Sequence, residues 1–277
     1  MSDHSIYRAN QELRETNSTF MDFIKFLRDF VILLIIVLLV RSFIVTPFRI
    51  SGSSMEASYH DGEYILIDKF SYLNFDTQFD NFITGASEKT FIEKGAELFK
   101  KIPIHIGDPK RGDVVVITPH VDPTKPYYIK RIVGMPGDTI RFENGKVSIK
   151  KPKSESFIEL SEDYLSVINE GQTNLPSSVT EKEFKIPQGF YWVMGDNRLN
   201  SADSRSCFHD CFREGATHFA ARKDIIGRVL LDFGHFDLFD GEFSLNPLKI
   251  PKLGTLKWLR QPRFFDTPRN AEYPELK

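Results

Sequence analysis

The strongest hydrophobic signal in the chain is an uninterrupted apolar run near its start, Phe30–Val40, with the sequence FVILLIIVLLV. A helix needs ~20 residues to cross a bilayer, and apolar residues on both sides extend this run to about that length. Charged side chains at its ends can reach the membrane surface. We therefore predict a transmembrane anchor over residues 26–46. A cleaved signal peptide fits poorly because a long segment precedes the run, whereas a buried core helix remains an alternative.

The positive charges around this segment predict its orientation. More of them precede it than closely follow it, with Arg8, Arg14, Lys25 and Arg28 before it and Arg41 and Arg49 after it. Positively charged flanks favour the cytoplasmic side of a membrane. We expect residues 1–25 to be a cytoplasmic N-terminal segment and the chain after about Pro47 to lie outside the cytoplasm.

Beyond the anchor, short segments rich in β-branched and aromatic residues predict strands, at 63–68, 113–118, 127–134, 139–142 and 189–196. Pairs of glycine and an acidic residue separate these segments and are typical of turns. The sequence Glu-Asn-Gly-Lys at 143–146 predicts a tight hairpin. The pattern therefore predicts a mainly β protein, with an antiparallel, strand-rich core preceded by one N-terminal transmembrane helix.

Polar segments divide this strand-rich region. We expect a domain over residues 47–240 that carries an insertion at 71–108, with a helical stretch near 87–101, and a small accessory lobe at 151–185. Prolines recur beyond Gly241, so residues 241–277 are predicted to form an irregular C-terminal tail.

Composition narrows the classes of function. The chain has 36 basic and 38 acidic residues, so its charge gives no case for a nucleic-acid partner. Only two cysteines occur, Cys207 and Cys211, which excludes a disulfide scaffold. Outside the cytoplasm they could pair across their short spacing or remain two thiols. Cys207, His209 and Cys211 lack a fourth ligand nearby, so a metal site there is disfavoured.

Three places could carry chemistry. The first is Ser54 in the sequence Ser-Gly-Ser-Ser-Met, because a serine beside a base becomes a nucleophile. The chain's histidines show no triad context, and Gly-x-Ser-x-Gly is absent. Taken alone, the serine cluster is better explained as a flexible loop.

The second place is Lys130. On a strand it shares a face with Tyr128 and Ile132, and burial among such neighbours lowers the pKa of a lysine so that its neutral amine can accept a proton. Taken alone, a solvated pair with Arg131 is the better explanation. The third place is the polar run at 195–205, which a site loop and a solvated turn explain equally well.

Together these stretches resemble the bacterial type I signal peptidases. Five blocks occur in family order behind the apolar segment: RSFIVTPFRI running into Ser54-Met55, DGEYILIDKF, KRGDVVVI, YYIKRIVGMPGD and GDNRLNSADSR. The resemblance implies that Ser54 is the nucleophile and Lys130 the general base, that Ser201 orients the lysine amine, and that Asp203 and Arg205 form a structural pair. It further implies that small substrate side chains bind in shallow pockets, lined by Phe48, Ile50 and Ile129.

From this resemblance we expect an enzyme without metal or cofactor that removes signal peptides from exported preproteins at the bacterial cytoplasmic membrane, as a monomer. The chain departs from the family pattern at Ser51 and Gly52, at Ala57-Ser58-Tyr59, and at Leu199, where the family usually has aspartate. Ser54 N–H would serve the oxyanion hole, with its second donor unidentified. A catalytically silent or differently specific homologue remains an alternative. A self-cleaving repressor-type protease is disfavoured by the apolar anchor and the lack of a DNA-binding module.

Overall fold

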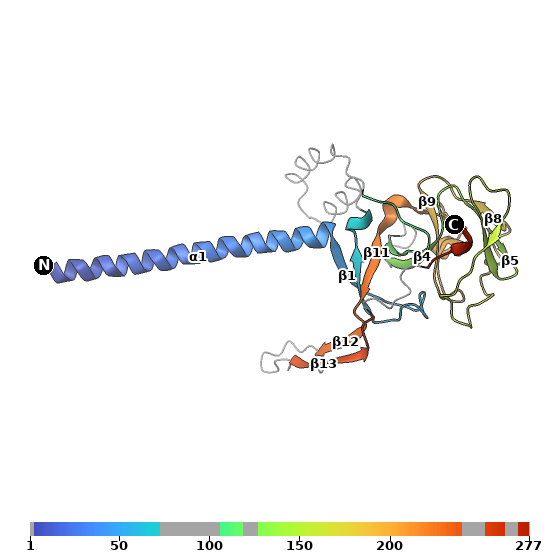
Figure 1. Ribbon diagram of the computed structural model, residues 1–277. Coiled ribbons are helices and arrows are strands. Elements are labelled where there is room, and N and C mark those ends of the chain that lie inside the picture. Colours follow the sequence, from blue (N-terminus) through green and yellow to red (C-terminus); the bar gives the residue numbers. More distant parts are fainter. Residues whose placement is uncertain (1–2, 73–105, 119–126, 240–252, 264–270, 277) are drawn as a thin grey trace. The chain divides into compact units, whose positions relative to one another are not determined.

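The computed structural model describes residues 3–72, 106–118, 127–239, 253–263 and 271–276 (Figure 1). It divides into two compact units, Met1–Ile44 and Val45–Lys277, which are considered separately below. The predicted helix at 87–101 and most of the insertion at 71–108 lie outside the described residues.

The first unit is one long helix, α1 (Asp3–Phe43). The apolar run predicted as an anchor lies within it, and large apolar side chains from Phe20 to Leu39 are exposed. The helix ends before the predicted limit at residue 46, because Pro47 disfavours a helical conformation at the residue before it. Among the described residues, no helix combines the length and the apolar character needed to cross a membrane.

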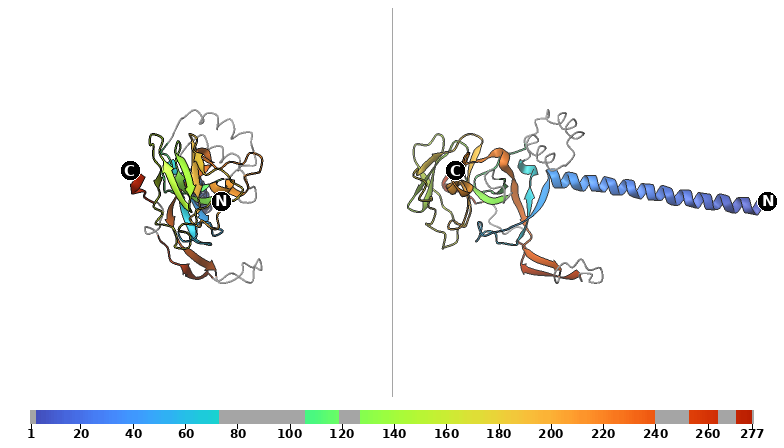
Figure 2. Two further views of the ribbon diagram at one scale, coloured as in Figure 1. Left: turned by 90° about the vertical axis from the view of Figure 1, so that its right-hand side faces the viewer. Right: turned by 180° about the vertical axis from the view of Figure 1, so that it is seen from behind.

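The second unit is built around a seven-stranded sheet (Figures 1 and 2). All its pairings are antiparallel, which confirms the predicted mainly β, antiparallel fold. Its strands, in spatial order, are β1 (Val45–Arg49), β2 (Tyr64–Asp68), β11 (Ile225–Asp232), β3 (Val114–Ile117), β4 (Tyr128–Gly134), β9 (Phe190–Met194) and β10 (Ala220–Ala221).

A second, four-stranded sheet contains the predicted hairpin. Its strands, in spatial order, are β7 (Ile158–Glu159), β6 (Lys146–Lys150), β5 (Thr139–Glu143) and β8 (Glu183–Lys185). Asn144 and Gly145 turn the chain between β5 and β6 with φ angles of 51° and 74°, the conformation that Asn-Gly favours. The segment predicted as an accessory lobe, 151–185, supplies β7 and β8 and is therefore part of this sheet.

Apolar side chains fill both faces of the seven-stranded sheet. On β3, Val115 and Ile117 join one core cluster, whereas Val114 and Val116 join another. Successive strand side chains point to opposite faces, so a strand that is apolar at every position fits a sheet covered on both sides. A third cluster joins the two sheets, with Trp192 of β9 among side chains from β5, β6 and β8.

Part of the predicted irregular tail, residues 241–277, forms a strand. Strand β13 (Leu253–Arg260) pairs with β12 (His235–Phe239) as a two-stranded ribbon (Figure 2). Trp258 packs edge-on against Phe236, which stacks on Tyr64 of β2. These aromatic contacts outweigh the proline content that suggested an irregular tail. Short 3-10 helices complete the fold: η1 (Phe70–Tyr72), η2 (Ser204–His209), η3 (Arg222–Asp224) and η4 (Pro274–Leu276).

Candidate active site

Ser54 lies in the loop that connects β1 to β2. The next residue, Met55, is buried in the apolar cluster beneath the loop, together with Tyr59. The carbonyl of Met55 accepts hydrogen bonds from the backbone N–H groups of Ser58 and Tyr59. The methionine therefore anchors a compact turn that presents the serine, which gives the Ser-Met pair of the sequence a structural reason.

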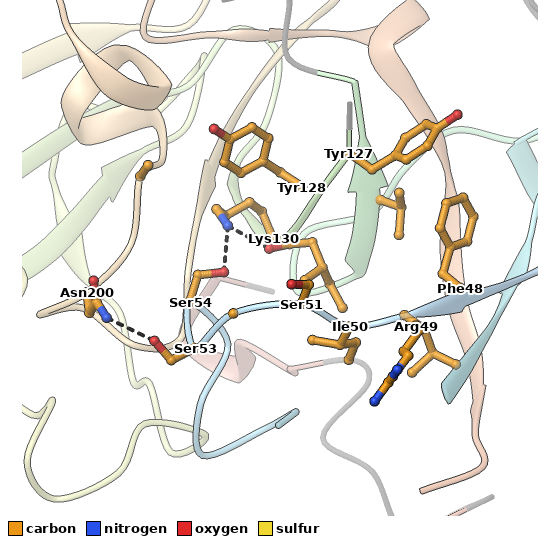
Figure 3. Close-up of a pocket in the computed structure, with 15 residues that line it drawn as sticks. Phe48, Arg49, Ile50, Ser51, Ser53, Ser54, Tyr127, Tyr128, Lys130 and Asn200 are labelled. Atoms are coloured by element: carbon orange, nitrogen blue, oxygen red, sulfur yellow. Dashed lines mark hydrogen bonds between the residues drawn. The ribbon is translucent and has the colours of Figure 1, made fainter. Parts of the chain in front are cut away.

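Lys130 lies on β4 opposite Val115 of β3, and its side chain is completely buried. Its Nζ is 2.8 Å from Ser54 Oγ and also donates a hydrogen bond of 2.8 Å to the carbonyl of Ile129 (Figure 3). The ring of Tyr128 lies 5.1 Å from the amine. Strand β4 thus brings the lysine amine within hydrogen-bond distance of a serine hydroxyl, the geometry required for proton transfer.

The structure records no hydrogen bond between Ser201 and Lys130. Its Oγ is buried and has no hydrogen-bond partner among the described residues. It packs against Gly195, where an added Cβ would collide with Ser201 Oγ and with the carbonyl of Ser54. Glycine at this position therefore lets the loop after β9 approach the nucleophile turn.

Asp203 and Arg205 form a buried ion pair beyond Ser201. Arg205 donates to both carboxylate oxygens, from Nε at 3.0 Å and from Nη2 at 2.9 Å. The carboxylate also accepts the backbone N–H of Gly195 at 3.0 Å. Burial alone would raise the pKa of Asp203, but the Arg205 guanidinium and these hydrogen bonds, with a smaller effect of Lys130, hold it below its ordinary value.

Two asparagines that the sequence did not single out hold the nucleophile turn in place. Asn197 donates from its backbone N–H to the carbonyl of Ser54 at 3.0 Å and from Nδ2 to the carbonyl of Ser53 at 3.0 Å. Asn200 Nδ2 donates to Ser53 Oγ at 2.9 Å (Figure 3). Both residues lie in the polar run at 195–205, so the sequence marked the loop, but it gave no sign of which segment this loop would contact.

Buried arginines tie the same loop to the rest of the domain. Arg131 pairs with Asp196 at 2.7 Å, and both side chains are fully buried. Arg198 binds Glu162 at 2.6 Å and donates to the carbonyl of Gly195 at 3.1 Å. The expected solvated lysine–arginine pair on β4 is therefore absent from the described structure, because Arg131 is paired inside the protein and Lys130 faces Ser54.

A cavity of about 580 Å³ opens beside the serine and lysine (Figure 3). Its lining includes Ser54, Lys130 and the predicted substrate-contacting residues Phe48, Ile50 and Ile129. Pockets of this size accommodate small ligands or several side chains of a peptide. The apolar wall and the reactive pair therefore belong to one site.

Cys207 and Cys211 form a disulfide, the first of the two alternatives left open by the sequence. His218 lies against them, and ligand atoms of the three residues are all within 4.8 Å of one another. His209, the histidine considered from sequence, is exposed. The histidine beside the disulfide is instead His218, because the chain folds back between η2 and β10.

Comparison with known proteins identifies the family of the chain. A family model described as signal peptidase, peptidase S26, matches residues 23–233, which include Ser54 and Lys130. The chain belongs to this family. Membership in the signal peptidase family confirms the resemblance found in the sequence.

Relatives in the signal peptidase family share moderate identity with the chain. A signal peptidase I of Pseudomonas fluorescens is 34% identical over 195 residues, covering 64% of this chain and 61% of that protein. Signal peptidase I T of Bacillus subtilis is 29% identical over 208 residues, covering 74% and 86% respectively. A crystal structure of a signal peptidase I from Enterococcus faecalis aligns with a TM-score of 0.30 and 25% identity, covering 44% of this chain and 97% of that one.

Proposed function

We propose that the chain is a serine endopeptidase that removes signal peptides from exported preproteins, with Ser54 as nucleophile and Lys130 as general base. The contact of 2.8 Å between Ser54 Oγ and a fully buried lysine amine carries this proposal. Family membership supports the reaction class, since the matched relatives are named signal peptidase I.

The proposed reaction proceeds in two transfers. Neutral Lys130 Nζ accepts the Ser54 hydroxyl proton as Ser54 Oγ bonds to the scissile carbonyl carbon. When the tetrahedral intermediate collapses, the C–N bond breaks and Lys130 returns the proton to the leaving amine. Water then attacks the acyl-enzyme, giving its proton to Lys130, and Ser54 leaves with that proton. The Ser54 N–H would stabilise the oxyanion.

The cavity fits a substrate with small side chains. Phe48, Ile50 and Ile129 form an apolar wall at one side of Ser54, so small apolar side chains near the scissile bond would be buried there. Strand β1 lies at an edge of the described sheet, and an extended peptide can bind such an edge through its backbone. In this proposal the unpartnered hydroxyl of Ser201 orients the lysine amine, and the ion pair of Asp203 with Arg205 supports the loop that carries Ser201.

We also propose that α1 attaches the chain to a lipid bilayer, with its N-terminus in the bacterial cytoplasm and the strand-rich domain outside. Side chains of the apolar run are exposed, for example Leu33 at 58% and Leu39 at 52%. So continuous an apolar surface is unfavourable in water. Flotation of the full chain with phospholipid vesicles, compared with a chain starting at Val45, tests this attachment. Equal flotation of the two chains would contradict it.

Cleavage of a purified preprotein tests the catalytic proposal. Ser54→Ala and Lys130→Ala should each abolish cleavage, whereas the matched controls Ser156→Ala and Lys146→Ala, at exposed positions, should not. Normal cleavage by Ser54→Ala would disprove the nucleophile assignment. No cleavage of any signal-peptide substrate by the unmutated chain would favour the catalytically silent homologue.

A further inference from the structure

The disulfide between Cys207 and Cys211 is surrounded by groups that position a third metal ligand. His218 Nε2 is 3.6 Å from Cys207 Sγ and 4.0 Å from Cys211 Sγ. Cys207 is buried, and the other two side chains are partly exposed. A metal ion approaching from solvent would therefore meet Cys211 and His218 first.

The protonated nitrogen of His218 follows from its partner. Nδ1 lies 2.6 Å from the carbonyl oxygen of Ser204 and 3.5 Å from Cys207 Sγ. A carbonyl can only accept a hydrogen bond, so Nδ1 carries the proton and Nε2 keeps its lone pair. A backbone carbonyl on the far nitrogen is the usual orienting partner of a metal-binding histidine.

Aromatic packing holds the imidazole in this orientation. The ring stacks on Trp192 at 5.5 Å with an interplanar angle of 11°, and Phe184 contacts it at 4.7 Å. Trp192 itself is fully buried between the two sheets. The nitrogen ligand is therefore fixed before any metal binds, which reduces the entropy lost on binding.

The nitrogen–sulfur distances are similar to those of a tetrahedral zinc site, but both sulfurs must move before a metal can bind. With Zn–S of about 2.3 Å and Zn–N of about 2.0 Å, tetrahedral angles place nitrogen about 3.6 Å from each sulfur and the sulfurs about 3.8 Å apart. The nitrogen–sulfur distances, 3.6 Å and 4.0 Å, are already close to this arrangement. Cys207 Sγ is, however, as near to Nδ1, at 3.5 Å, as to Nε2, so it lies beside the ring and not in line with the Nε2 lone pair. After reduction both sulfurs must move toward Nε2 and away from each other, and their Cα atoms, 5.0 Å apart, allow this by side-chain rotation.

The backbone of the loop that the disulfide closes is strained. Cys207 and Phe208 have φ angles of 50° and 65°, a left-handed conformation that costs free energy in residues other than glycine. The first is a cysteine of the disulfide, and the second follows it inside the loop that the disulfide closes. Breaking the cross-link lets them relax, whereas a metal could hold the two sulfurs at a larger separation.

We propose that Cys207, Cys211 and His218 form a zinc site when their disulfide is reduced. A dithiol reductant transfers two electrons and two protons to the disulfide, giving two thiols and its own disulfide. Zn²⁺ then displaces both thiol protons and binds the two thiolates and His218 Nε2, with water as the fourth ligand. In an oxidising compartment the disulfide persists and the site is closed.

Metal binding by the full chain in detergent tests this proposal independently of peptidase activity. The protein is reduced with a phosphine, which is then removed, and titrated anaerobically with Co²⁺. We expect one equivalent to bind with the charge-transfer bands of cobalt thiolates, and Zn²⁺ to displace it. Oxidised protein should show neither. Equal binding by the oxidised and reduced forms would overturn the proposal.

Two histidine variants test whether His218 is the nitrogen ligand of the proposed site. His218→Gln should weaken Zn²⁺ affinity of the reduced protein by roughly tenfold or more, as expected for losing a ligand, whereas His209→Gln should leave it unchanged. An equal loss in both variants would overturn the assignment. If His218→Gln does not fold, alkylation of the unmutated reduced protein provides the test: Zn²⁺ should protect both cysteines, and alkylation at an unchanged rate would refute the site.

Discussion

Lys130 Nζ and Ser54 Oγ lie 2.8 Å apart although their residues are separated by 76 positions in the sequence. The lysine is held by a strand and the serine by a turn anchored through Met55. Among the residues that the structure describes, no histidine lines the cavity that contains them. This amine is therefore the base that we propose for the serine.

The proposed role of Lys130 predicts a dependence of cleavage on pH. Only the neutral amine can accept the Ser54 proton, so the rate should rise with pH as Lys130 loses its own proton. We expect kcat/KM to increase from about pH 6 toward about pH 10. This rise lies at higher pH than the rise expected for an enzyme whose general base is a histidine. Circular dichroism at each pH controls for unfolding. A flat profile over this range would argue against a lysine base.

Replacing Asn197 should slow catalysis while leaving substrate binding largely intact. Asn197→Ala removes the side-chain donor to the Ser53 carbonyl, and a misplacement of the reacting atoms by ~1 Å can cost about 100-fold. We expect kcat to fall by roughly 10- to 100-fold with little change in KM. Asn200→Ala, which removes only the contact with Ser53 Oγ, should have a smaller effect. A purely structural role would instead lower the thermal stability and leave kcat unchanged.

The ion pair of Asp203 predicts a stability that depends on pH. Asp203→Asn leaves Arg205 buried without its counter-charge, which should reduce the free energy of unfolding by about 3–5 kcal/mol at neutral pH. The folded-state pKa of Asp203 is lowered, so its contribution is present above the ordinary Asp pKa and is lost as pH falls through the folded-state value. Denaturant unfolding of both proteins measures the difference.

The difference between Asp203→Asn and the unmutated protein should therefore shrink in acid. Asp163→Asn serves as a control, because that side chain is exposed and its hydrogen bond is local. A deficit for Asp203→Asn that stays constant from neutral pH into strong acid would contradict the ion-pair explanation.

Gly195 should tolerate no side chain. In Gly195→Ala the new Cβ would collide with the carbonyl of Ser54 and with Ser201 Oγ, so the nucleophile turn must move and cleavage should fall about 100-fold. Gly189→Ala is a matched control, because the new Cβ there meets open space. The φ of 77° at Gly189 still costs an alanine about 1 kcal/mol of stability. Lower stability with normal cleavage is expected there. Normal cleavage by Gly195→Ala would show that the close approach is unimportant.

The local sequence patterns predicted where strands occur better than which strands pair with each other. Val114–Ile117 and Tyr128–Gly134 are recognisable from their β-branched residues, and Asn144-Gly145 identifies the hairpin. The position of β11 between β2 and β3 is a long-range pairing with no local signature. The same limit explains the ribbon of β12 and β13, which depends on aromatic contacts with Tyr64 rather than on its own proline-rich surroundings.

The candidate site was predictable where residue type and order sufficed. Ser54 and Lys130 followed from their place in ordered blocks, and strand neighbours indicated that Lys130 would be buried. Asn197 and His218 could not be found in this way, because each acts on a segment distant in sequence: the Ser53–Ser54 carbonyls for Asn197 and the Cys207–Cys211 disulfide for His218. The polar run at 195–205 contains Asn197 but did not give its contacts, and no pattern in the sequence marked His218.

The central place of β11 has a consequence for a chain that is still being synthesised. In the described sheet, strands β1 and β2, which flank the turn of Ser54, are joined by strand pairing to the half that contains Lys130 through β11 (Figure 1). That strand begins at Ile225, so a nascent chain has both reactive residues long before the element that unites them. The proposed protease should therefore remain inactive on the ribosome until residues beyond 232 emerge, without needing an inhibitory pro-segment.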